Sequence, residues 1–128
     1  MLLELLWIGK GWPGLTIYGM PGVTDFIKGV GDPDDADAID AMFEYVGEYG
    51  PPRIKSKCRP LAEKIFELKP GAVRLPFFYD GQHRATIVIT HGFMKKSQKT
   101  PPREREFAEK QHGIYLVALR KGSVKYED

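Results

Sequence analysis

The chain of 128 residues is 42% hydrophobic, which suits one compact domain over residues 1–128 with a single core. Its one cysteine excludes an internal disulfide, and no apolar segment approaches the roughly 20 residues of a transmembrane helix. The N-terminal apolar run Leu2–Ile8 is short and lacks the basic lead-in of a secretion signal. We therefore expect a soluble cytoplasmic protein without a membrane partner.

Charge is distributed unevenly along the chain, although the net charge is only +2. Residues 1–52 hold two lysines and nine acids, a net charge of −7. Residues 53–128 hold 17 lysines and arginines and eight acids, a net charge of +9. This polarity predicts that one surface meets a polyanion, whereas the acids are equally consistent with the solvated face of a helix.

The N-terminal part predicts a strand, a loop and a short helix. The strand is expected at Leu2–Ile8, buried on both faces, and a loop rich in glycine and proline extends to Gly22. Within this loop, Leu15–Tyr18 is compatible with a short strand. Thr24 is a favourable N-cap for a brief helix that ends near Val30.

A longer helix is the clearest local prediction. Asp32 suits the N-cap and Pro33 the first helical position, and Gly50 with two following prolines ends the helix. Its apolar residues recur at i, i+3, i+4 and i+7, a single stripe typical of a helix that packs on a core. The stripe comprises Ile39, Met42, Phe43 and Val46.

After a basic linker at residues 53–59, three strands are predicted at Lys64–Leu68, Val73–Tyr79 and Arg84–Phe93. Pro-Gly and Asp-Gly pairs separate them, so we expect an antiparallel meander. Alternation in the middle strand turns Arg74 away from the apolar face. Pro76 cannot donate a backbone hydrogen bond there, which predicts a bulge or a gap in the pairing.

The last predicted element is a helix with Thr100 as N-cap and Pro101 as its first residue. Gly113 is expected to divide it, and Ile114–Leu119 is compatible with helix or strand. From Gly122 onward the pattern indicates a frayed, charged tail.

The candidate functional residues centre on a basic loop. Lys95, Lys96 and Lys99 place three positive charges within five positions, shortly after His91. A loop at the end of a strand can present such charges to an anion, but a lysine cluster is most often a solvated loop.

The sequence lacks a Cys/His metal pattern, a P-loop and a dinucleotide fingerprint, so no metal or cofactor is expected. The remaining arginine, lysine, histidine and tyrosine side chains suit metal-free RNA cleavage, in which a ribose hydroxyl is the nucleophile. In that reaction Arg74 and the lysines would supply cations over the phosphate. His91 would serve as acid or base, and Tyr115 would stack on a base or act as an acid.

Two of these residues also have structural interpretations. His91 shares parity with Ile87, Ile89 and Phe93, so strict alternation makes it a hydrogen-bonded core histidine, unless Gly92 introduces a bulge that redirects it. Arg74 could instead pair with Glu67 on the neighbouring strand. The sequence alone leaves both alternatives open.

Four segments in the last two-thirds of the chain, roughly, resemble the pattern of the HigB-like, phage-derived branch of the RelE/ParE toxin superfamily. In chain order they are Arg59-Pro60-Leu61, Ile65–Lys69, Val73–Leu75 and His91–Pro101. The resemblance implies an α+β, RelE-like fold: two N-terminal helices packed on a small twisted antiparallel sheet, with a C-terminal helix. The other face of that sheet and the last helix would form a basic cleft.

The same resemblance implies the toxin of a type II toxin-antitoxin module. Such toxins are endoribonucleases that cut messenger RNA on the ribosome and are neutralised by an antitoxin, here expected to be a small helix-turn-helix protein. Arg74, Lys95, Lys96 and Lys99 lie inside the matching motifs. Lys69 replaces the usual arginine, and because lysine lacks the bidentate fork, a phosphate contact there would change. The alternatives are a ParE-like toxin that binds a topoisomerase and a phage regulator that binds nucleic acid without cleaving it.

Overall fold

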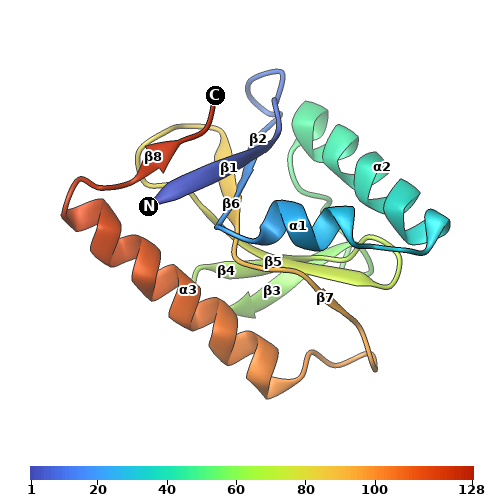
Figure 1. The fold of residues 1–128 in the computed structure, drawn as a ribbon. Helices are drawn as coiled ribbons and strands as arrows, with labels where there is room; N and C mark the ends of the chain where they lie inside the picture. Colours follow the sequence, from blue (N-terminus) through green and yellow to red (C-terminus); the bar gives the residue numbers. More distant parts are fainter.

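The computed structural model describes residues 1–128 and contains three helices and eight strands (Figure 1). In chain order the elements are β1 (Leu2–Trp7), β2 (Thr16–Gly19), α1 (Val23–Lys28), α2 (Pro33–Tyr49), β3 (Cys58–Ala62), β4 (Ile65–Leu68), β5 (Val73–Tyr79), β6 (Thr86–Ile89), β7 (Phe93–Met94), α3 (Pro102–Arg120) and β8 (Lys125–Tyr126). None of the helices combines the length and the apolar character needed to cross a membrane.

The strands form a mixed sheet in the order β3-β4-β5-β6-β2-β1-β8, and β7 pairs with the start of β5. Most neighbours are antiparallel, but β2 runs parallel to β6 and β1 runs parallel to β8. The prediction of two N-terminal helices on a small antiparallel sheet is therefore wrong. The helices α1 and α2 instead follow a first hairpin, β1–β2, in the chain. This hairpin enlarges the sheet, because β2 pairs in parallel with β6.

The sheet is covered on both faces (Figure 1). On one face, the apolar stripe of α2 and Val23 of α1 pack against side chains of the central strands, including Leu75 and Phe77. On the other face, α3 packs through Tyr115 and Ala118 against Phe78 of β5 and its neighbours. The sheet therefore separates two apolar clusters.

The predicted features of α2 are confirmed. The Asp32 carboxylate accepts hydrogen bonds from the backbone N–H groups of Asp34 and Asp35 at 2.8 and 3.2 Å. This capping satisfies donors that the first helical turn leaves unpaired. Gly50 ends the helix with a φ of 84°. The four residues of the stripe, Ile39, Met42, Phe43 and Val46, are all buried.

Replacing Phe43 with alanine is expected to lower the free energy of unfolding by about 3 kcal/mol or more, because the side chain is only 3% exposed. Urea denaturation of the two proteins would measure the difference. Tyr45→Ala is a matched control, since Tyr45 lies on the same helix and is 45% exposed. Equal stability of the Phe43 variant and the parent would contradict this packing.

Two predicted helix starts are displaced. The first helix begins after Gly22, whose φ of 102° places it in the left-handed region, and not after Thr24. The last helix begins after Pro101, and Thr100 does not cap it. The Thr100 hydroxyl instead donates to the Glu67 carboxylate at 2.8 Å. The Thr100 oxygen also accepts from Arg59 Nη2 at 2.9 Å, so both roles of this hydroxyl are taken by the sheet and not by the helix N-terminus.

The C-terminal predictions also require correction. Gly113 does not divide α3, and the segment after Gly122 is not frayed, because β8 adds a parallel strand beside β1. The backbone N–H of Lys125 donates to the Met1 carbonyl at 2.7 Å. The Tyr126 hydroxyl donates to the buried Asp80 carboxylate at 2.8 Å.

Three strand predictions change in extent or environment. The predicted strand Arg84–Phe93 is divided into β6 and β7, and the break lies opposite Pro76, where a gap in pairing was predicted. Part of the predicted linker forms β3, which lies at the edge of the sheet. Only Leu3 is buried in β1, so this strand is not buried on both faces. A position near the other edge of the sheet explains its partial exposure.

Candidate nucleic-acid interface

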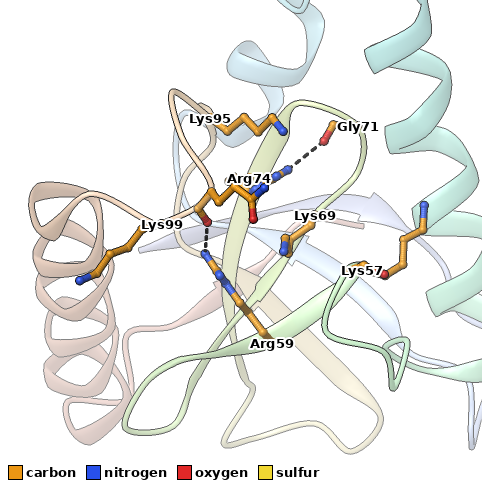
Figure 2. A pocket seen from close by; sticks show the side chains of 9 residues that line it. Lys57, Arg59, Lys69, Gly71, Arg74, Lys95 and Lys99 are labelled. Atoms are coloured by element: carbon orange, nitrogen blue, oxygen red, sulfur yellow. Dashed lines mark hydrogen bonds between the residues drawn. The ribbon is translucent and has the colours of Figure 1, made fainter.

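A polar cavity of about 530 Å³ lies over the ends of β3, β4 and β5, beside the basic loop (Figure 2). No hydrophobic or acidic residue is among the nine that line it. Six of the nine carry a positive charge: Lys57, Arg59, Lys69, Arg74, Lys95 and Lys99. We refer to this feature as the cationic cavity.

Strand alternation places four of these cations on one face of the sheet. Arg59 pairs directly with Glu67 across β3 and β4, so their side chains share a face. Lys57 lies two residues before Arg59 and Lys69 lies two residues after Glu67, so both share this face, and the Lys69 N–H donates to the Lys57 carbonyl at 2.8 Å. On β5, Glu67 pairs with the residue two positions after Arg74, which turns Arg74 to the same face.

Arg74 lies at the centre of the cavity, with Lys69, Lys95 and Arg59 around it (Figure 2). The residue is 7% exposed, and its Nη1 donates to the carbonyls of Gly71 and Val73 at 2.9 and 2.8 Å. These two bonds fix the guanidinium plane. The other guanidinium nitrogens make no hydrogen bond within the protein, so they remain available to a ligand in the cavity.

The turn that holds Arg74 is fixed by α2. Gly71 adopts a φ of 56°, in the left-handed region that favours glycine. The Asp35 carboxylate accepts from the N–H of Ala72 at 2.9 Å. On the other side, the N–H of Lys95 donates to the Ala72 carbonyl at 2.8 Å. The turn therefore connects Arg74 to both the acidic helix and the basic loop.

A buried carboxylate fixes the far end of the basic loop. Glu67 is fully buried and accepts from the Arg59 Nε at 3.2 Å and from the Thr100 hydroxyl at 2.8 Å. Arg59 Nη2 also donates to the Gln98 carbonyl at 3.1 Å. The alternative pairing of Arg74 with Glu67 is therefore absent, because Arg59 and Thr100 occupy this carboxylate.

The electrostatics of the cavity favour a bound anion. Burial lowers the pKa of Arg74 from its ordinary value, and the nearby charge of Arg59 lowers it further. Burial also lowers the pKa of Lys69, as do the charges of Arg59 and Arg74. Burial is the larger cause of both pKa shifts, the neighbouring cations add to it, and only Glu67 opposes it. A phosphate in the cavity would relieve the repulsion among these cations.

Four of the predicted site residues line the cationic cavity together: Lys69, Arg74, Lys95 and Lys99. Lys96 is exposed and does not line the cavity, although it follows Lys95 directly. The loop thus divides its lysines between the cavity and the solvent.

His91 lies outside the cavity, between the basic loop and α3. Its Nδ1 is 2.9 Å from the Thr90 hydroxyl, and its Nε2 is 3.2 Å from a Glu104 carboxylate oxygen. The ring stacks on Phe93 and contacts the edge of Phe107. These contacts describe a hydrogen-bonded, largely buried histidine. It packs against α3 and not with the cluster of Ile87 and Ile89 that strict alternation indicated, because the strand is interrupted between β6 and β7.

The environment of His91 predicts a pH dependence of stability. Burial lowers its pKa below the ordinary value near 6.5, although the Glu104 carboxylate opposes this shift. Below pH 6.5 the unfolded chain therefore binds a proton that the folded chain does not, and stability falls as pH drops through this interval. Replacing His91 with glutamine should reduce the fall, as measured by urea denaturation between pH 7.5 and 5.5. The same pH dependence in parent and variant would contradict the prediction.

Tyr115 also lies outside the cationic cavity. It is 1% exposed and donates to the Asp80 carboxylate, and the N–H of Gly81 donates to its hydroxyl at 2.7 Å. Burial and the hydrogen bond to Asp80 raise the pKa of Tyr115 to about 12. In this position the ring supports the β5–β6 turn and the packing of α3.

Comparison with known protein families identifies the family to which this chain belongs. Residues 27–112 match the family described as "Phage derived protein Gp49-like (DUF891)". The chain belongs to this family. Gp49-like proteins are associated with the RelE-like toxin group. A search of curated proteins found no match.

The matched range of this Gp49-like protein contains every residue that lines the cationic cavity. Among these, sequence reasoning did not select Lys57 and Arg59 as site residues. Pairing Arg59 with Glu67 across the two strands would have placed Arg59, and Lys57 two residues before it, on the face of Arg74. That signal was missed because residues 53–59 were interpreted as a linker and not as the approach to a strand.

Proposed function

We propose that this Gp49-like protein is the toxin of a type II toxin-antitoxin module and cleaves messenger RNA on the ribosome without a metal ion. The observation that carries the proposal is the cationic cavity, in which six positive side chains and no acid surround an opening large enough for a phosphate. Membership of the Gp49-like family supports the toxin assignment.

In the proposed reaction, the ribose 2′-hydroxyl oxygen attacks the adjacent phosphorus and the bond from phosphorus to the 5′-oxygen breaks. The 2′-hydroxyl proton passes to a base, and an acid supplies a proton to the leaving 5′-oxygen. Arg74 would stabilise the charge that develops on the phosphoryl oxygens, because its free donors are held in place by two carbonyls. Lys69 is the lining group best suited to proton transfer, since its pKa is lowered.

The chemistry of the product ends tests this proposal. Purified protein is incubated with ribosomes that carry a labelled messenger, and the cut ends are mapped and identified. Attack by the 2′-hydroxyl leaves a 2′,3′-cyclic phosphate and a 5′-hydroxyl. Cut ends that carry a 5′-phosphate, or the absence of cut ends, would contradict the proposed reaction.

A second candidate is a module that binds nucleic acid without cleaving it. The position of His91 and Tyr115 favours this candidate, because both lie outside the cationic cavity and the lining holds no histidine or tyrosine. In that case the same cavity would bind the phosphate backbone and no cut ends would form.

We also propose that a small helix-turn-helix antitoxin neutralises the protein in the cytoplasm. Acidic side chains of such a partner would complement the six cations and exclude RNA. Expression of the chain alone should then stop growth. Abundant expression without a growth defect would contradict this part of the proposal.

A further inference from the structure

A second opening lies beside the cationic cavity, between the end of α2 and strands β3–β5. Its volume is about 480 Å³, and half of the residues that line it are hydrophobic. Five aromatic side chains contribute to it: Trp12, Tyr49, Phe66, Phe77 and Tyr79. Arg53 and Arg59 are its only charged residues. We refer to this feature as the aromatic groove.

Three of the rings are unusually exposed for their size. Trp12 is 84% exposed, Tyr49 is 58% exposed and Tyr79 is 51% exposed. Single exposed apolar side chains are ordinary, but several aromatic rings around one opening indicate a surface that binds a ligand.

The loop that carries Trp12 is firmly supported by α2. The Lys10 N–H donates to the Gly47 carbonyl at 2.9 Å, and the Leu15 N–H donates to the Val46 carbonyl at 3.0 Å. A Cβ at Gly14 would clash with the carbonyl of Gly47, so the two backbones are in direct contact. Trp12 is therefore presented from a fixed backbone, although its own ring is exposed.

The groove and the cavity adjoin at the edge strand β3, and Arg59 lines both. The cavity lies on the face of the sheet that carries Arg74, whereas Phe66 and Phe77 of the groove lie on the opposite face. A ligand that occupies both openings therefore passes around this edge strand. The neighbouring thiol of Cys58 is not suited to covalent chemistry, because burial raises its pKa to about 11. The groove thus offers ring faces, apolar walls and two positive charges.

We propose that the aromatic groove binds unpaired bases of single-stranded RNA while the adjoining phosphates occupy the cationic cavity. This inference rests on the proposed function and specifies its substrate as RNA with unstacked bases. Bases stack on tyrosine and tryptophan regardless of sequence, and arginine adds attraction to the backbone. The charge of the groove disfavours a basic protein segment, because both of its charged residues are positive and no carboxylate is present. An acidic protein segment would match these charges but would leave the exposed rings of Trp12, Tyr49 and Tyr79 without planar partners, whereas RNA supplies both phosphates and bases.

Two RNA probes separate base binding from phosphate binding. The first is a labelled single-stranded oligonucleotide of eight uridines, and the second is an abasic oligonucleotide of the same length and charge. Trp12→Ala and Tyr79→Ala should each weaken binding of the first probe by roughly 5- to 150-fold and leave the second unchanged. Phe107→Ala is the control, since Phe107 is also an exposed aromatic residue, at 42%, but lies on α3 outside the groove.

Each outcome decides between the two proposals. Selective loss of the uridine probe would support the aromatic groove as a base site. Unchanged binding of both probes by the Trp12 and Tyr79 variants would overturn it, leave the cationic cavity intact as a phosphate site and assign the groove to a protein partner. A parent protein that binds neither probe would overturn the proposed function together with this inference. Thermal unfolding of each variant shows that the fold is retained.

Discussion

Replacing Arg74 with alanine is expected to lower the rate of RNA cleavage by about 100-fold, the scale for losing one preorganised donor. RNA affinity should fall by no more than roughly fourfold at physiological salt, because one of six phosphate-binding cations is lost. The difference between the two effects follows from geometry. Arg74 is held by the carbonyls of Gly71 and Val73, so its remaining donors are already oriented toward charge that develops in the transition state. Single-turnover cleavage and equilibrium binding measure the two quantities separately.

Two further variants make the test of Arg74 specific. Arg74→Lys keeps the positive charge but lacks the planar fork, so we expect it to bind RNA normally and to cleave slowly. Lys96→Ala should behave as the parent protein in both measurements, since Lys96 does not line the cavity. Equal losses of affinity and rate in the Arg74 variants would assign Arg74 to ground-state binding and favour the module that binds without cleaving.

Neutralising Lys69, Lys95 and Lys99 together should weaken RNA binding by roughly 50-fold at about 0.15 M salt. Each cation that contacts a phosphate releases bound counterions, so the plot of log K against log salt should become shallower by about 0.7 for each lysine replaced by glutamine. Binding measured at several salt concentrations gives both the affinity and the slope.

A control variant with the same change in net charge separates direct lysine–phosphate contacts from the general attraction of RNA to a positively charged protein. Lys96, Lys110 and Lys121 are exposed and lie outside the cavity, so replacing them with glutamine removes three charges from other surfaces. This control should reduce the affinity much less and leave the slope close to that of the parent. Equal effects of the two triple variants would show that RNA responds to the overall charge and not to the cationic cavity.

Local features could be predicted where the causes are local. The N-cap at Asp32, the helix end at Gly50 and the buried stripe that includes Phe43 all depend on residues within one helix. The face of Arg74 and the gap beside Pro76 follow from strand alternation and from a missing backbone donor. These features do not require knowledge of the sheet order.

The sheet itself could not be predicted, because its unexpected parts depend on distant pairing. Strand β2 joins β6 and strand β1 joins β8 through parallel ladders between distant parts of the chain, and β8 is only two residues long. Such short strands carry no periodic signal. Two predicted site residues were misplaced for the same reason, because their positions depend on distant contacts. Tyr115 is hydrogen-bonded to Asp80 and His91 to Glu104, and neither contact can be read from spacing in the sequence.

The binding surface itself can be mapped by amide chemical shifts during titration with a short single-stranded RNA. We expect the largest changes at residues that line the cationic cavity, among them Lys57, Lys69, Arg74 and Lys95. Smaller changes should extend to Trp12 and Tyr79 in the aromatic groove. The acidic outer face of α2 should not respond. Changes confined to other surfaces, or no saturable change with RNA, would contradict the assignment of the cationic cavity as the nucleic-acid site.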